Sequence, residues 1–324
     1  MSALLELEEL HVWFDLPGAQ ELHAVQGVSL SLDPGERLGL VGESGCGKTT
    51  TVLGLLGLLP PSASVSGRVL LNGSDILAGG EETIRPHRWV DLAIVFQGAM
   101  NALNPVKTVG SQISEALELH GRSSGREARA RVGELLESVG IPAHRADRFP
   151  HEFSGGMRQR AAIAMALACN PSVLIADEPT TALDVMVQAQ ILELLDGLCR
   201  DFGLALLLVT HDLPVVAQLC DRAAVMYAGE IVEEGSVDAL YHDPRHPYTR
   251  LLFAATPDLY GGESPISIPG APPRLDRPLV GCPFQPRCDR AFARCSDERP
   301  LLKDLGGKRA AACHLNDVAA EVPA

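Results

Sequence analysis

The sequence predicts an α/β protein built on a largely parallel β-sheet with helices on both faces. Strand-like and helix-like runs alternate along residues 1–255, as in chains that wind repeatedly through one sheet. One strand-like run leads through a glycine-rich loop directly into a helix-like run. Other buried runs end in polar side chains, at the sheet edge where parallel folds bind ligands.

Composition fits a folded protein and excludes several classes of function. The chain has 324 residues, 46% of them hydrophobic, which is enough for one large domain with an appendage or for two domains. Its net charge of −14 argues against general attraction to nucleic acid. No apolar run approaches the roughly 20 residues of a membrane span, and the N-terminus lacks a basic signal region. We therefore expect a cytosolic chain.

The most informative stretch is Gly42–Thr49, which has the spacing of the phosphate-binding loop. Leu38–Val41 before it is strand-like, and Thr50–Leu56 after it is helix-like. Glycines let backbone N–H groups point at phosphate oxygens, Lys48 can reach the β- and γ-phosphates, and the Thr49 hydroxyl can ligate Mg²⁺. The expected ATP contacts in this region are Gly42, Glu43, Ser44, Gly45, Cys46, Gly47, Lys48, Thr49 and Thr50.

Strand-like segments lie on both sides of this loop. Leu4–Phe14 and Leu22–Leu32 alternate apolar and polar residues on either side of Pro17-Gly18, which predicts antiparallel strands. Buried or alternating runs predict further strands at 66–72, 92–96, 173–176, 205–210, 223–227 and 231–234. A tight turn joins the last two runs and indicates a hairpin.

Helical periodicity begins after Thr108. It predicts helices near 109–119, 132–139, 158–169, 189–198 and 212–220. Ser154 is a suitable N-cap for the third of these, which is apolar nearly all round. We expect a helical subdomain over about residues 105–170. Beyond residue 255 proline, glycine and cysteine replace periodic runs, so we predict domains at 1–255 and 256–324.

Polar residues follow several of the predicted strands. Asp177 would hold Mg²⁺, and Glu178 would orient and deprotonate the attacking water. His211 can contact the γ-phosphate, and Gln97 can ligate Mg²⁺ or the water. A solvated acidic turn would explain Asp177 and Glu178 in isolation. Their position downstream of a phosphate-binding loop favours the catalytic interpretation.

Over roughly residues 4–255 these ordered motifs resemble the nucleotide-binding subunits of ABC transporters. Ser154-Gly155-Gly156-Met157, preceded by Phe153, resembles the signature motif, usually Leu-Ser-Gly-Gly-Gln, with its Ser-Gly-Gly core intact. The resemblance implies four further matches. Thr181–Asp184 resembles the D-loop, with Asp184 as its site residue, and Gln97 the Q-loop. His211 resembles the switch histidine, and Phe14, with Trp13 one residue away, the aromatic residue that stacks on adenine. The resemblance implies a P-loop domain with a mainly parallel core, an antiparallel β subdomain and a helical subdomain.

The resemblance also implies partners. In this family the signature of one subunit closes over nucleotide held by the phosphate-binding loop of another. Since this chain has one of each, we expect a second ABC ATPase subunit, such as a paralogue. Two membrane-spanning permease subunits and an extracytoplasmic solute-binding protein are also implied. The permease subunits would hold the chain at the cytoplasmic face of the inner membrane.

The C-terminal tail carries four of the eight cysteines, spaced C-x5-C-x6-C-x17-C: Cys282, Cys288, Cys295 and Cys313. In a reducing cytosol a metal or cluster site is favoured over disulfides. Together with residues 242–250, this tail resembles the oligopeptide/dipeptide branch of ABC importers, where it can hold a [4Fe–4S] cluster. Zn²⁺ is the main rival, although close C-x2–4-C pairs are missing, and four unconnected cysteines are the third alternative.

The leading hypothesis is an ATPase subunit that powers an ABC importer, with di- or oligopeptides as the expected solute. An importer of the same branch for nickel or another solute stays open, because this subunit never meets the solute. A soluble ABC ATPase acting on DNA or ribosomes is the alternative from another class. Such proteins typically carry two nucleotide domains, a coiled-coil insertion or basic arms, and none occurs here. A P-loop kinase or GTPase would leave Ser154-Gly155-Gly156 unexplained.

Overall fold

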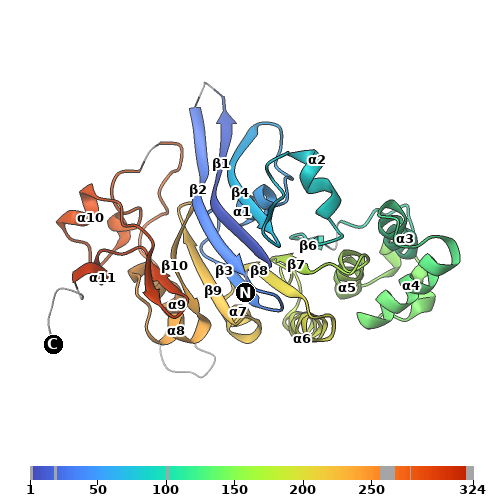
Figure 1. The fold of residues 1–324 in the computed structure, drawn as a ribbon. Coiled ribbons are helices and arrows are strands. Elements are labelled where there is room, and N and C mark those ends of the chain that lie inside the picture. The colour runs from blue at the N-terminus through green and yellow to red at the C-terminus, as the bar shows by residue number, and fades with distance from the viewer. Residues whose placement is uncertain (1–2, 18–19, 100–101, 256–266, 278, 319–324) are drawn as a thin grey trace. The chain divides into compact units, whose positions relative to one another are not determined.

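The computed structural model describes residues 3–17, 20–99, 102–255, 267–277 and 279–318 (Figure 1). The chain forms two compact units. The first comprises Met1–Ser31, Arg37–Ala78 and Val209–Ala324, and the second Leu32–Glu36 and Gly79–Leu208. The predicted domain boundary after residue 255 borders residues 256–266, which lie outside the described ranges, and it stays a prediction.

The N-terminal part of the first unit is a four-stranded sheet in the order β2-β1-β4-β5. Its strands are β1 (Leu5–Leu16), β2 (Gln20–Leu32), β4 (Ala63–Leu71) and β5 (Ser74–Asp75). β1 and β4 are antiparallel, with Leu5 opposite Leu71 and an irregularity between Glu8 and His11. Leu10 and Val12 are buried two residues apart, so one face of β1 packs inward, against α1 among other elements. The two strands predicted from alternation are confirmed.

A second group of strands in the first unit follows the order β11-β12-β10-β9-β3. The strands are β3 (Arg37–Val41), β9 (Arg222–Tyr227), β10 (Glu230–Ser236), β11 (Lys303–Gly306) and β12 (Arg309–Ala311). β3 runs parallel to β9, with Val41 opposite Val225. β9 and β10 form the predicted hairpin, and β12 adds to β10 with Ala311 opposite Glu233. The tail thus extends this group by two strands that the sequence did not predict.

Helices cover the strands of the first unit. They are α1 (Lys48–Leu55), α7 (Leu213–Leu219), α8 (Val237–His242), α9 (Pro247–Ala254), α10 (Ala293–Asp297) and α11 (Leu315–Val318), with a 3₁₀ turn at Gln285–Arg287. α7 lies so close to β3 that a Cβ on Gly39 would sit 2.8 Å from the Cγ1 atom of Val216. This close approach fixes the strand that leads into the glycine-rich loop.

In the second unit β7 (Val173–Asp177) lies between β6 (Leu92–Val95) and β8 (Ala205–Thr210). β6 and β7 are parallel, with Val95 opposite Ala176. Every residue of β7 and β8 is buried, which explains why both sequences are apolar up to their last residue. The ends of β6 and β7 therefore share one edge.

The helices of the second unit include the predicted helical subdomain. They are α2 (Glu81–Ile84), α3 (Val109–Leu119), α4 (Gly125–Ser138), α5 (Gly155–Ala166) and α6 (Val185–Phe202), with 3₁₀ turns at Arg85–His87, Ala143–Asp147 and Pro150–Glu152. α3, α4 and α5 contact one another. α4 begins seven residues before the helix predicted from residue 132. Its first two turns bury only Ala128, so this part of the helix lacks the apolar periodicity on which the prediction is based. Within the described ranges, no helix combines the length and apolarity needed to cross a bilayer.

Candidate active site

The glycine-rich loop joins β3 to α1 in the first unit. Two of its glycines are required by close backbone approach. A Cβ on Gly42 would lie 2.2 Å from the Met226 carbonyl oxygen, and one on Gly47 would lie 2.8 Å from the Ala24 carbonyl oxygen. Gly47 is also the N-cap of α1, with a φ of 110°. The loop is therefore wrapped tightly around the start of α1, where N–H groups favour anions.

Lys48 lies inside this loop. Its side-chain Nζ donates hydrogen bonds to the carbonyl oxygens of Gly42 at 2.7 Å and Glu43 at 3.1 Å. Thr49 next to it is exposed, so its hydroxyl is open to a ligand. Cys46 is buried, and burial raises the pKa of its thiol. The loop thus carries one enclosed cation and one accessible hydroxyl, which suits a phosphate with its Mg²⁺.

Phe14 and Trp13 lie on opposite faces of β1, because consecutive strand residues point to opposite sides. Trp13 stacks on His23 and His11, with ring centroids 4.6 Å and 5.3 Å away. Phe14 shares the face of buried Val12, two residues before it, and is itself partly exposed. Of the two aromatic residues, Phe14 is therefore on the inward face of β1.

His211 follows β8 and is exposed. The backbone N–H of Asp212 donates to the Thr210 side-chain oxygen at 3.0 Å, which fixes the turn that presents the histidine. His211 belongs to the first unit, together with the glycine-rich loop.

The predicted acidic pair lies in the second unit at the end of β7. Asp177 is 1% exposed, and Glu178 is the next residue, with a φ of 50°. The Thr181 hydroxyl donates to a Glu178 carboxylate oxygen at 2.8 Å. Since β6 is parallel to β7 in this register, Gln97 leaves its strand at the same edge as Glu178. The structure thus brings these two predicted residues to neighbouring strand ends.

The signature-like and D-loop-like segments are the N-termini of α5 and α6. The Ser154 hydroxyl accepts a hydrogen bond from the Met157 N–H at 3.3 Å, which confirms the predicted N-cap. Asp184 caps α6 in the same way, accepting from the Val187 N–H at 3.0 Å. A Cβ on Gly156 would lie 2.7 Å from a Val187 methyl carbon, so the two helix starts are in contact. Both helix starts present N–H groups that favour anions.

Two glutamines that sequence reasoning missed hold the turn between Glu178 and Asp184. Gln159, which is buried, donates to the Pro179 carbonyl oxygen at 2.8 Å. Gln188 donates to the carbonyl oxygens of Thr180 and Leu183, each at 3.2 Å. Because both act on the backbone of another segment, no local pattern singles them out.

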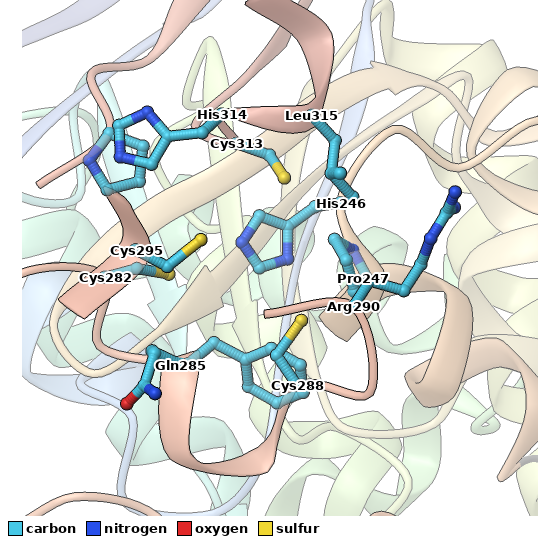
Figure 2. Close-up of a pocket in the computed structure, with 12 residues that line it drawn as sticks. His246, Pro247, Cys282, Gln285, Cys288, Arg290, Cys295, Cys313, His314 and Leu315 are labelled. Carbon is cyan, nitrogen blue, oxygen red and sulfur yellow. The ribbon is translucent and has the colours of Figure 1, made fainter. Parts of the chain in front are cut away.

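The four tail cysteines line one pocket with His246 and His314 (Figure 2). All four are free thiols, and burial raises the pKa of Cys282 and Cys288 and brings that of Cys313 to about 11. Burial lowers the pKa of His246 to about 3, so its ring is neutral. Its Nδ1 accepts from the Tyr248 N–H at 3.0 Å. Over the described residues, no group of three or more His, Cys, Asp or Glu side chains is arranged to hold a metal ion.

Comparison with known protein families agrees with this arrangement. Residues 25–181 match the family described as ABC transporter. Residues 232–295 match the family described as oligopeptide/dipeptide transporter, C-terminal region. A dipeptide transport ATP-binding protein of Bacillus subtilis is 46% identical over 328 residues, covering 99% of this chain and 97% of that protein. This chain belongs to the ATP-binding proteins of ABC transporters, in the oligopeptide/dipeptide branch. The predicted family and fold are thereby confirmed, and the chain is an ATPase.

A further relative and two solved structures are also similar to this chain. An oligopeptide transport ATP-binding protein of Escherichia coli is 46% identical, covering 95% of this chain and 92% of that protein. A dimeric ABC cassette solved with ADP and phosphate is similar in structure, with a TM-score of 0.64 and 30% identity over 72% of this chain and 98% of that one. An ABC subunit from Clostridium perfringens gives a TM-score of 0.63 and 31% identity over 75% and 92%. ATP and Mg²⁺ are therefore the expected ligands of this ABC ATPase.

Proposed function

We propose that this chain hydrolyses ATP at Gly42–Thr49 to drive a membrane importer of di- or oligopeptides. The observation that carries the nucleotide site is the glycine-rich loop itself, with Lys48 enclosed by the carbonyl oxygens of Gly42 and Glu43. The solute class is supported by relatives of nearly equal length that are named for dipeptide and oligopeptide transport.

Each site residue has a proposed role. Lys48 and the loop N–H groups bind the phosphates, and Phe14 stacks on adenine from the inward face of β1. Thr49, Gln97 and Asp177 hold Mg²⁺ or its waters. Glu178 activates the attacking water as general base, and His211 contacts the γ-phosphate. The helix start at Ser154-Gly155-Gly156-Met157, with Asp184, supplies N–H groups to a nucleotide bound by the opposing subunit.

A second ABC ATPase subunit completes the proposed site. The start of α6 exposes two apolar side chains, Val185 at 78% and Met186 at 71%, directly after Asp184. Such exposure beside a capped helix start suits an interface. A similar cassette has been solved as a dimer. ATP bound between two such subunits would draw them together, and hydrolysis would release them.

Membrane attachment is proposed to come from two permease subunits. Apolar side chains near the Q-loop and the helical subdomain are exposed, among them Phe96, Val106 and Phe149. They suit docking by a cytoplasmic segment of the permease. The chain would then work at the cytoplasmic face of the membrane, and an extracytoplasmic binding protein would deliver the peptide.

Purification of the tagged full-length chain from its own cells tests this proposal. We expect permease and ATPase partners to co-purify, and ATP hydrolysis by the reconstituted complex to rise when binding protein and dipeptide are added. Lys48→Ala should abolish that hydrolysis. Recovery with ribosomes or DNA and never with permeases would refute the transport function. Stimulation by nickel and not by peptides would refute the peptide as solute.

We further propose that the four-thiol pocket holds a [4Fe–4S] cluster. Four cysteine thiols are the usual donor set of such a cluster. A structural Zn²⁺ held by the same four thiols is the rival ligand. Because no group of three or more His, Cys, Asp or Glu side chains among the described residues is arranged to hold a metal ion, the proposal is carried by the donor set and by the pocket that the four cysteines share. When bound, the cluster would link the tail segments or exchange an electron.

Anaerobic purification tests the cluster. We expect a brown protein with about four irons per chain and matching sulfide, and loss of both in Cys313→Ser. Cys220→Ser is the matched control, because Cys220 is a cysteine that does not line the pocket. A colourless protein that contains zinc, or no metal at all, would refute the cluster.

A further inference from the structure

Glu43, the second residue of the glycine-rich loop, is held by two residues from the C-terminal region. Arg287 donates two hydrogen bonds to its carboxylate, from Nη1 at 2.7 Å and from Nη2 at 2.9 Å. The backbone N–H of Glu43 donates to the Tyr248 hydroxyl at 2.9 Å. Both side chain and backbone of this loop residue are therefore bound by segments more than 200 residues away.

Arg287 is itself firmly placed. Its side chain is 4% exposed, against 25% for Glu43. The remaining donors reach the Pro269 carbonyl oxygen at 2.7 Å and the Tyr227 hydroxyl at 3.2 Å. Its guanidinium lies 5.7 Å and 5.8 Å from the ring centroids of Tyr227 and Phe284. A forked, largely buried arginine–carboxylate pair is strong and directional.

The pair with Arg287 neutralises the negative charge of the Glu43 carboxylate, which lies in the proposed phosphate-binding loop. The Glu43 carbonyl oxygen already accepts from Lys48 at 3.1 Å, while its carboxylate is bound to Arg287. Without Arg287, the carboxylate would be an unpaired negative charge next to the loop. It would then repel triphosphate and compete with it for the Lys48 ammonium.

We propose that Arg287 is a positioning residue for the nucleotide site, which acts by binding and neutralising Glu43. The inference rests on the proposed nucleotide site at Gly42–Thr49. It makes the C-terminal region part of the ATP-binding apparatus.

The cysteine pocket is connected to the same loop residue by two short routes. Arg287 immediately precedes Cys288, which lines the pocket. His246 also lines the pocket, and its ring accepts the N–H of Tyr248, whose hydroxyl binds Glu43. One or two residues therefore separate the pocket lining from Glu43 along each route.

The test measures ATP affinity by calorimetry with Mg²⁺ on the full-length chain. Arg287→Gln should raise the dissociation constant about ten-fold, as expected for losing charge-assisted hydrogen bonds. Adding Glu43→Gln to it should restore affinity to within about three-fold of wild type, because the unpaired carboxylate is gone. Arg287→Lys, which keeps the charge and loses the fork, should be intermediate. Rescue by a substitution in the loop is a readout that damage to the tail alone would not give.

Arg294→Gln is the matched control. Arg294 also forms a forked pair in the tail, with Glu298 at 2.6 Å and 2.8 Å. The affinity of the Arg294→Gln variant for ATP should stay within two-fold of the wild-type value. Wild-type affinity in Arg287→Gln would overturn the inference, as would a double variant as weak as the single one. If instead Lys48→Ala left ATP binding unchanged, the proposed nucleotide site itself would fail. The two failures are therefore distinct.

Discussion

Glu178 has a backbone conformation that few side chains adopt. Its φ of 50° lies in the left-handed region, as does the φ of 65° at Ala182 in the same turn. Each such residue costs on the order of 1 kcal/mol, and the surrounding contacts must outweigh that cost. Gln159 and the Thr181 hydroxyl supply two of these contacts. The strained turn fixes the direction of the Glu178 carboxylate, as the proposed role of general base requires.

Glu178→Gln should retain ATP binding and lose at least 100-fold in hydrolysis rate, because an amide cannot accept the proton of the attacking water. The measurement is ATP turnover in the assembled complex alongside ATP affinity. Thr181→Ala is a milder comparison, since it removes only the hydroxyl that fixes the carboxylate. Steady turnover in Glu178→Gln would refute the role of general base.

Cys46 should react slowly with iodoacetamide at neutral pH. Burial raises the pKa of its thiol, so the reactive thiolate is scarce below pH 9. The rate should rise about ten-fold per pH unit from pH 7 to 9 without levelling off. Mass spectrometry of the Cys46 peptide would measure it, with and without Mg-ATP. Modified protein should lose ATP binding, whereas Cys46→Ser should bind ATP with or without reagent. A rate that levels off below pH 9 would contradict the buried thiol.

At the scale of elements, the proposed site is assembled from strand ends and helix starts. The ends of β6 and β7 carry Gln97 and Glu178, and the starts of α5 and α6 carry the signature and D-loop segments. Asp184 serves its helix directly as an N-cap, in addition to any role across a subunit interface.

Asp184→Ala should lower the melting temperature by about 2–4 °C, which corresponds to roughly 1 kcal/mol for a lost N-cap. Asp184→Asn should melt within about 1 °C of wild type, because asparagine is an equally good cap. Asp201→Ala, at the other end of α6, serves as control and should have little effect. Calorimetry without nucleotide measures all three. Equal melting of the alanine and asparagine variants would contradict the capping role.

The elements that the sequence predicts well are those with a local signal. Leu38–Val41 and Val173–Ala176 are apolar runs, and they lie within β3 and β7. Ser154 precedes an apolar helix, and it is the N-cap of α5. By contrast β11 and β12 are short and lack alternation. β12 pairs with β10 and β11 pairs with β12, so both strands depend on tertiary contact and not on a local pattern. Arg287 has no local signal either, because nothing near it in the sequence indicates a partner at Glu43.

At the scale of the whole molecule, the tail completes structures that begin elsewhere. β12 covers the edge of β10, and Glu233 on β10 is fully buried. Its carboxylate accepts the N–H groups of Arg245 and His246 at 2.7 Å and 2.8 Å, and lies 3.5 Å from Arg309. Without β12 this edge of β10 would be unpaired, and unpaired strand edges invite association between chains.

A chain that ends at residue 255 should therefore aggregate or melt well below the full-length protein. It loses β12, Arg309 and Arg287 together, and so exposes the edge of β10. Size-exclusion chromatography with light scattering measures the outcome. A monodisperse 1–255 chain with wild-type melting would show that the tail is dispensable for folding.

The pairing of Arg287 with Glu43 also sets an order of events in time, because 244 residues separate them along the chain. At about 5–20 residues per second, a ribosome adds Arg287 roughly 12–50 s after Glu43. During that interval the emerging glycine-rich loop has no arginine to neutralise its carboxylate. If Arg287 positions the nucleotide site as proposed, a nascent chain acquires its full affinity for nucleotide only after residue 287 has been added and has paired with Glu43.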